Sequence, residues 1–152
     1  MNLPSFLREG RQEILAEAVA SVRRARLEHY EKAGADLVHQ RLDDLLSLTI
    51  TAVADRNLAP MVAHANAVAL ERFEGGVDLA EVQTAFNVLE EVIWLRILKH
   101  MPSQEQAEAL GLVGTVLGAG KDNLARRYVS LASQTHAPSL NLQALFSGTE
   151  GY

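Results

Sequence analysis

Apolar residues recur at spacings of three and four along most of this chain, and few breaks interrupt them. Near the start, Ile14, Ala18 and Val22 show this spacing. The pattern is typical of one face of an α-helix, whereas no stretch sustains the alternation of a half-buried strand. Proline, the strongest helix breaker, occurs only at positions 4, 60, 102 and 138. The sequence therefore predicts an all-α fold.

The breaks divide the chain into five predicted helices. They span residues 5–33, 35–54, 60–74, 79–101 and 103–135. Ser5 is expected to cap the first helix, with Pro4 just outside it. Long helices with short connections predict an antiparallel bundle of about five helices. We expect this bundle to occupy residues 1–135 as one sensor or interaction domain, with a C-terminal tail over residues 136–152.

Three short motifs predict where the later helices begin and end. Asp78 with Glu81, and Ser103 with Gln106, have the spacing of capping boxes. Gly75–Gly76 follows the third helix, and a glycine there can adopt the left-handed conformation that ends a helix. The residues expected to face inward are Val38, Leu42, Leu45, Leu46, Thr49 and Val53, then Met61, Ala65, Val68 and Ala69, then Leu110, Val113, Leu117, Leu124, Tyr128 and Leu131.

The helix expected over residues 79–101 is apolar over an unusually wide arc. One stripe contains Leu79, Val82, Phe86, Leu89, Ile93 and Ile97. A second stripe includes Val88, Val92 and Leu95, and Trp94 lies beside the first. Such a helix is either central to the bundle or also covered by another subunit. Trp94 would be an interface anchor if exposed and ordinary core if buried, so we count these last four residues as interface candidates.

Three glycines, Gly111, Gly114 and Gly118, lie on one face of the last predicted helix. Each costs a helix up to ~1 kcal/mol relative to alanine, so a compensating gain is expected. The usual compensating gain is the close approach of another backbone. We favour packing inside the subunit over an interface between subunits. A ligand lying on the smooth face is a third possibility. The three glycines are therefore also interface candidates.

Composition excludes several classes of partner. The net charge is −5 and no basic stripe is present, so nucleic acid is not an expected partner. No apolar run approaches the ~20 residues of a membrane span, and the N-terminus lacks the features of a signal peptide. Cysteine is absent, which excludes thiolate metal sites and fits a reducing compartment. We expect a cytoplasmic protein without a membrane partner.

No motif points to catalysis. The adjacent pairs Asp43–Asp44 and Glu90–Glu91 diverge by ~100° on a helix, so we expect them on solvated faces and not in one pocket. Neither a nucleophile elbow nor a phosphate-binding loop occurs. The prediction is a non-catalytic protein with no catalytic residue, and a cryptic enzyme is kept as an alternative.

The histidines do not predict a metal site. No two of the five lie three or four positions apart, as ligands on one helix would. We therefore expect neither a metal nor a cofactor. If haem is bound, His64 or His100 is the candidate ligand, because apolar residues follow histidine there and the chain has a globin-like length.

Arg72 lies among apolar residues near the end of the third predicted helix, with Glu71 and Glu74 close by. It can reach the surface and pair there while its stem packs on apolar neighbours. Alternatively, it ties its helix to the start of the next, and we predict this role of structural anchor.

An ordered pattern covers the middle of the chain: Arg72, the Gly75–Gly76 break, the acid-capped run Asp78 to Val82, Ala85–Phe86, and Ile93–Trp94. It resembles the helical N-terminal domains of the RsbR-type family, the RsbT co-antagonist proteins of bacterial stress signalling. The segment Arg11 to Leu15 resembles the opening helix of that family. The resemblance implies an input domain that is usually dimeric and coupled to an output module. Related input domains resemble globins that lack haem, which makes a globin-like arrangement the alternative fold.

The leading hypothesis is a bacterial cytoplasmic signalling domain that forms a homodimer and binds a protein partner of a signalling pathway. The alternative is a sensor for a small molecule or haem.

Overall fold

The computed structural model describes residues 2–25 and 28–140, and all regular structure in these ranges is helical. The helices are α1 (Leu3–Glu9), α2 (Arg11–Arg24), α3 (Glu28–Ala33), α4 (Ala35–Asp55), α5 (Ala59–Glu74), α6 (Leu79–His100) and α7 (Ser103–Leu140). The all-α prediction is confirmed, and α4 to α6 begin and end close to the predicted positions. α7 continues to Leu140, past its predicted end at residue 135. Residues 141–152 of the expected tail lie outside the described residues.

The prediction of a single first helix is wrong, because α1, α2 and α3 occupy its range. Asn2 caps α1 in place of Ser5, whose backbone N–H donates to Asn2 Oδ1 at 2.9 Å, and Pro4 lies within the first turn. Gly10 separates α1 from α2 and is buried against the side chain of Arg96, where a Cβ would overlap the guanidinium. The absence of a side chain at Gly10 thus permits a close contact with α6, which the local spacing of apolar residues does not reveal.

The two predicted capping boxes do not form. Asp78 is the N-cap residue of α6, but its side chain makes no capping hydrogen bond. Gln106 instead donates to the carbonyl oxygens of Leu98 and Met101, at 3.3 and 3.0 Å. Its amide therefore holds the end of α6 against the first turns of α7.

Residues of α7 hold the turn between α5 and α6. Within Gly75–Gly76, Gly76 has a left-handed φ of 74°, whereas Gly75 has a φ of −78°. The Tyr128 hydroxyl donates to the Val77 carbonyl oxygen at 2.9 Å. The Tyr128 ring also packs edge-on against Phe73, with 5.6 Å between ring centroids. The far part of α7 is thus tied to the connection that precedes α6.

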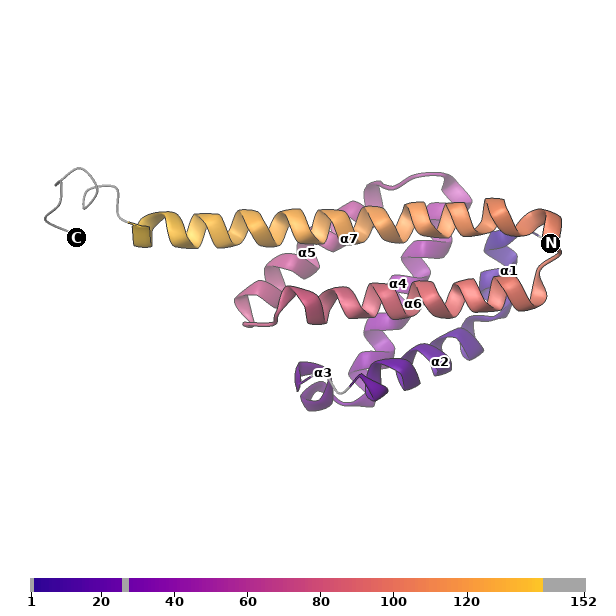
Figure 1. The fold of residues 1–152 in the computed structure, drawn as a ribbon, viewed down its shortest axis with the longest axis horizontal. Helices are drawn as coiled ribbons and strands as arrows, with labels where there is room; N and C mark the ends of the chain where they lie inside the picture. The colour runs from indigo at the N-terminus through magenta and orange to yellow at the C-terminus, as the bar shows by residue number, and fades with distance from the viewer. Residues whose placement is uncertain (1, 26–27, 141–152) are drawn as a thin grey trace, which may run out of the picture.

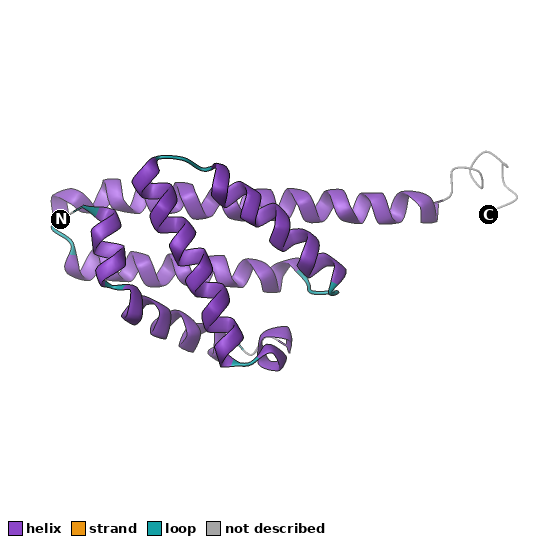
Figure 2. Ribbon diagram, turned by 180° about the vertical axis from the view of Figure 1, so that it is seen from behind, coloured by secondary structure: helices purple, strands orange, loops and turns teal. Residues whose placement is uncertain are grey.

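The helices form two crossed layers. α6 and α7 lie side by side and antiparallel, and α7 extends well beyond the start of α6 (Figure 1). Seen from behind, α4 crosses this pair obliquely and α5 runs against α7 (Figure 2). α2 packs against both α4 and α6. Because α4 crosses the α6–α7 pair, the simple antiparallel bundle is not confirmed.

The core lies between these layers, and the predicted inward faces of the long helices are confirmed. The buried residues include Val38, Leu42, Leu45, Leu46, Thr49 and Val53 of α4, Met61, Ala65 and Ala69 of α5, Val82, Phe86, Leu89, Ile93 and Ile97 of α6, and Val113, Leu117, Leu124, Tyr128 and Leu131 of α7. Burying one large aliphatic or aromatic side chain stabilises a fold by ~1.5–3 kcal/mol. Among the described residues, no helix is both long and apolar enough to cross a membrane.

Candidate functional site

Contacts near both ends of the α6–α7 pair fix its antiparallel register. At one end, Lys121 Nζ lies 2.8 Å from Asn87 Oδ1 and 3.3 Å from Glu90 Oε1. At the other end, the Gln106 amide donates to the Leu98 carbonyl oxygen. These contacts determine which residues of the two helices lie at the same level.

The register brings the two predicted groups of interface candidates together. Glu90, Trp94 and Leu98 follow one another at a spacing of four and form a single ridge on α6. A Cβ built on Gly114 would lie 3.7 Å from Glu90 Oε2, which places this ridge beside the glycines of α7. Trp94 then lies at the level of Gly111. We call the surface formed by Trp94, Leu98, Gly111, Gly114 and Gly118 the α6–α7 face.

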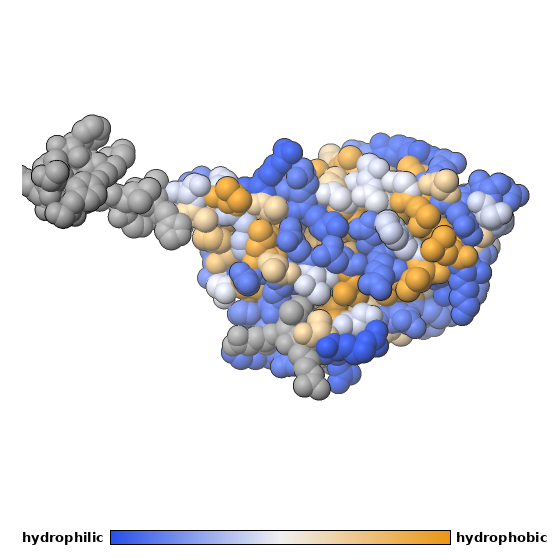
Figure 3. Space-filling view, in the orientation of Figure 1, coloured by the Kyte–Doolittle hydropathy of each residue, from blue (hydrophilic) through white to orange (hydrophobic). Residues whose placement is uncertain are grey.

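Large apolar side chains of α6 remain exposed on and beside this face. Trp94 is 44% exposed, Leu98 51% and Leu95 60%. In the space-filling view, apolar residues gather over α6 and α7 near the end where α6 finishes and α7 begins (Figure 3). Leu98 was not among the interface candidates, although its position one turn after Trp94 could have indicated it.

The other two candidates of α6 belong to the interior of the chain. Val92 is buried in the core, and Val88 is half-buried and packs against it. The second apolar stripe is therefore divided: Val92 faces the cleft against α2, while Leu95 lies at the rim of that cleft.

The glycine face of α7 points outward, so the prediction of close packing inside the subunit is wrong. A Cβ at Gly111 or Gly118 would have no non-local heavy atom within 4 Å, and at Gly114 it would make an ordinary contact. The close approach occurs at Gly120, on the opposite side of α7, where a Cβ would lie 2.7 Å from Phe86 Cε2 and 3.0 Å from Met61 Sδ.

Arg72 does not reach the surface. Its side chain is only 11% exposed, and Nη1 donates to Glu71 Oε1 at 2.5 Å, within its own helix. Among the described residues, no hydrogen bond of its side chain links α5 to α6, so the anchor role remains a prediction. Arg72 instead lines a cavity of about 250 Å³ between α3, α4, α5 and α6, together with Tyr30, Arg41 and His64.

Burial shifts the protonation equilibria of the polar groups around this cavity. It lowers the pKa of Arg41, and the nearby positive charge of Arg72 lowers it further. Burial also raises the pKa of Tyr30 and lowers the pKa of His64. At neutral pH the cavity therefore has two cationic guanidinium groups, a neutral phenol and a neutral imidazole.

The two histidines proposed for haem lie in different surroundings. His64 lines the cavity, but 250 Å³ is below the ~300–1,000 Å³ of pockets that enclose drug-sized ligands, and haem is at least that large. His100 is exposed at the end of α6. Among the described residues, no group of three or more His, Asp or Glu side chains is arranged to hold a metal ion.

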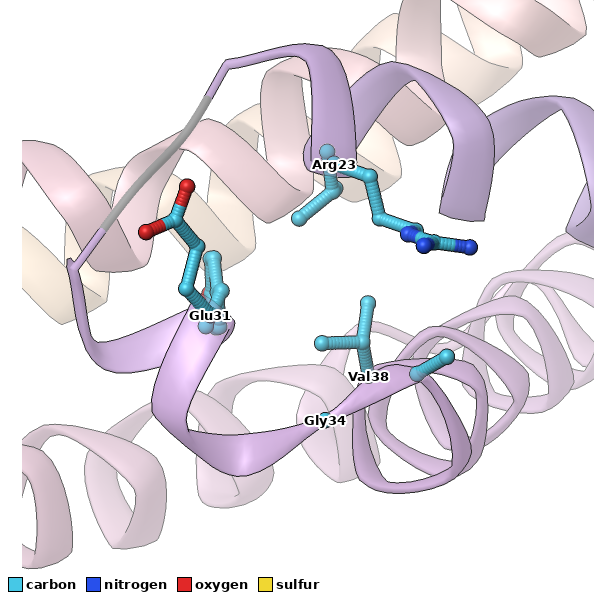
Figure 4. A pocket seen from close by; sticks show the side chains of 7 residues that line it. Arg23, Glu31, Gly34 and Val38 are labelled. Atoms are coloured by element: carbon cyan, nitrogen blue, oxygen red, sulfur yellow. The ribbon is translucent and has the colours of Figure 1, made fainter.

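A second cavity, of about 300 Å³, lies between α2, α3 and the start of α4, and Val22, Tyr30 and Val38 form its apolar part. Arg23 and Glu31 also line it, but their charged groups lie on opposite sides and point away from each other (Figure 4). They do not converge on a common ligand position.

The adjacent carboxylates separate as predicted, but they are not simply solvated. Asp43 pairs with Arg11 of α2, and Glu90 pairs with Lys121 of α7. Glu91 is exposed, and so is Asp44. One member of each pair thus links two helices, and neither pair converges on a pocket.

Comparison with known proteins identifies the family. No curated protein and no solved structure matches the chain, so the globin-like alternative gains no support from a structural relative. Residues 12–138 match the family described as RsbT co-antagonist protein rsbRD N-terminal domain. The resemblance seen in the sequence is therefore confirmed over most of the chain. The chain belongs to the RsbRD N-terminal domain family, whose members are regulatory domains of stress-response signalling.

Proposed function

We propose that this domain is a non-catalytic, cytoplasmic regulator that self-associates through the α6–α7 face and binds a protein partner of its signalling pathway. The observation that carries the proposal is the exposure of Trp94 and Leu98 beside Gly111 and Gly118, where a Cβ would meet no atom of another described element within 4 Å. The chain belongs to a family of regulatory domains, and this membership supports a non-catalytic role.

A second copy of the chain is the occupant that suits this face. In a two-fold contact, residue i of one copy meets residue j of the other and the reverse, so a surface must be complementary to itself. The α6–α7 face contains both halves of such a contact: a protruding tryptophan and a smooth row of glycines. Trp94 of each copy would pack over the glycines of the other. Close contact there would offset the helix propensity that three glycines cost.

Light scattering tests the proposal, with charge placed on the face. We expect the unmodified chain to show twice its mass of 16.6 kDa, and Trp94→Glu and Leu98→Glu to show the single-chain mass. Desolvating the new carboxylate inside an apolar contact disfavours the dimer. Leu70→Glu is the matched control, because Leu70 is 39% exposed but lies on α5, away from the face.

Circular dichroism checks that each variant remains helical. Two results contradict the proposal: an unmodified chain with the mass of one copy at all concentrations, or a Leu98→Glu variant that dimerises as well as Leu70→Glu. Retention of its protein partner by a monomeric variant would separate partner binding from self-association.

A further inference from the structure

Two guanidinium groups from different helices converge on the cavity between α3, α4, α5 and α6. Arg41 belongs to α4 and Arg72 to α5, and both line it. Arg72 is buried and Arg41 is half-buried. A buried cation is costly unless a partner compensates its charge. Glu71 pairs with Nη1 of Arg72 at 2.5 Å, and its own side chain is 68% exposed.

Among the described residues, Arg41 makes no hydrogen bond or ion pair, and Arg72 bonds through Nη1 alone. The remaining N–H donors of the two groups are therefore available to the cavity that they line. The charges are close enough for the positive charge of Arg72 to act on the protonation of Arg41. An anion between them would relieve this repulsion, and the planar fork of arginine donors suits a carboxylate.

Acidic residues lie at the rim of the same cavity, at Asp44 and Glu71. Both are exposed, and Asp44 already accepts a hydrogen bond from Gln40 at 3.0 Å. They do not fill the interior. These carboxylates instead favour ligands of low negative charge, since a ligand with a single negative charge meets less repulsion at the rim than a multiply charged one.

The remaining wall of the cavity is apolar. It is formed by Leu37, Leu45, Val68, Val82, Ala85 and Phe86. The cavity has a volume of about 250 Å³. The cavity thus combines a cationic end with an apolar body of limited length.

We propose that this cavity binds a small organic monocarboxylate, whose carboxylate is held by Arg41 and Arg72 and whose short apolar body packs against Val68, Val82 and Phe86. The Tyr30 hydroxyl is a further hydrogen-bond donor beside the guanidinium groups. Because the cavity shares no residue with the α6–α7 face, this inference does not depend on the self-association proposed above.

Isothermal titration calorimetry of the full chain tests the proposal, with benzoate and hexanoate as probes at constant ionic strength. Benzamide has the shape of benzoate without its charge, and inorganic phosphate has charge without an apolar body. We expect saturable binding of at least one carboxylate, with benzamide and phosphate bound at least about tenfold more weakly. Benzamide loses a charge-assisted hydrogen bond, and phosphate loses the apolar contacts.

Arg41→Gln should weaken carboxylate binding about 10- to 100-fold. Arg126→Gln is the matched control, because Arg126 is exposed on α7 and pairs only with Asp122 at the surface. If Arg41→Gln loses its helical circular dichroism, Arg41→Lys replaces it, since lysine keeps the charge but loses the fork. Ala85→Leu adds bulk to the cavity wall without changing charge and should also weaken binding.

The proposal is overturned if neither carboxylate binds, if the Arg41 variant binds as the unmodified chain does, or if benzamide matches benzoate. Phosphate binding at least as tight as carboxylate binding would overturn the assignment to an organic ligand.

Discussion

Glycines along α7 have opposite surroundings although they share one helix. Gly111 faces open space, while Gly120 lies against Phe86 and Met61, both buried in the core. At Gly111 the chain gives up helix propensity without an intramolecular gain. At Gly120 the missing side chain allows α5, α6 and α7 to approach one another. The same residue type is thus a packing requirement at one position and an exposed surface feature at the other.

This contrast predicts opposite effects of the same substitution. Gly120→Ala should lower the free energy of unfolding by up to ~2 kcal/mol, because overpacking costs ~1–3 kcal/mol and alanine returns ~1 kcal/mol of helix propensity. Gly111→Ala should raise it by ~0.5–1 kcal/mol. Urea denaturation at a concentration where the chain is monomeric measures both. Equal stabilisation by the two alanines would show that the contact with Phe86 is not tight.

At the scale of helices, the sequence predicted the elements whose apolar spacing runs uninterrupted. α4, α5, α6 and α7 each bury the stripe expected of them, since a long amphipathic pattern has one favourable orientation. The breaks between the short N-terminal helices were missed. At the first of them, Gly10 lies against the side chain of Arg96, and the spacing of apolar residues does not reveal such a contact between distant helices.

The candidate sites were predictable to different degrees for the same reason. Trp94 and the glycines of α7 could be found as excess apolar or small surface on single helices. The presence of Arg41 and Arg72 at one cavity could not be found in this way, because it depends on how α4 and α5 meet α6. Glu81 shows the same limit: it was expected to cap its own helix, but it accepts the His29 backbone N–H at 3.2 Å and lies 2.9 Å from His29 Nδ1.

Tyr128 is the residue through which α7 holds the α5–α6 turn, and it makes the stability of that junction depend on pH. Burial raises the pKa of Tyr128 to about 12, above its usual value of 10.0, because desolvation disfavours the charged phenolate. In its neutral form the hydroxyl donates to the Val77 carbonyl oxygen. Because the pKa of Tyr128 is higher in the folded state, its contribution to the free energy of unfolding is complete below pH 10 and is lost as the pH rises toward 12.

Tyr128→Phe should therefore cost ~1 kcal/mol of unfolding free energy at pH 7, through loss of the hydrogen bond. Between pH 10 and 12 the difference between the unmodified chain and the variant should shrink, because only the unmodified chain has this phenol to ionise. Urea unfolding of both proteins at neutral and alkaline pH measures the difference, and effects of other groups cancel in the comparison. A difference that stays constant or grows would contradict the assigned role.

At the scale of the whole molecule, the crossed layers separate two surfaces with different chemistry. The α6–α7 face lies on the outside of the antiparallel pair, whereas the arginine-lined cavity lies where α3, α4 and α5 meet the start of α6. α6 contributes to both, with Val82 and Phe86 at the cavity and Trp94 and Leu98 on the face. One helix therefore contributes residues both to the cavity and to the face.

Trp94 is the only tryptophan of the chain, so its fluorescence reports directly on the α6–α7 face. In a single copy its side chain is partly exposed to water, and in a two-fold contact the glycines of the second copy would cover it. We expect the emission maximum to move to longer wavelength on dilution, as mass action returns the dimer to single copies.

Gly111→Leu should give the long-wavelength emission at all concentrations. In the isolated chain a side chain at position 111 has open space, whereas across a self-complementary contact it would hold the copies apart. Ala67→Leu, at an exposed position of α5, should behave as the unmodified chain does. A Gly111→Leu variant whose emission still depends on concentration would show that Trp94 meets some other surface.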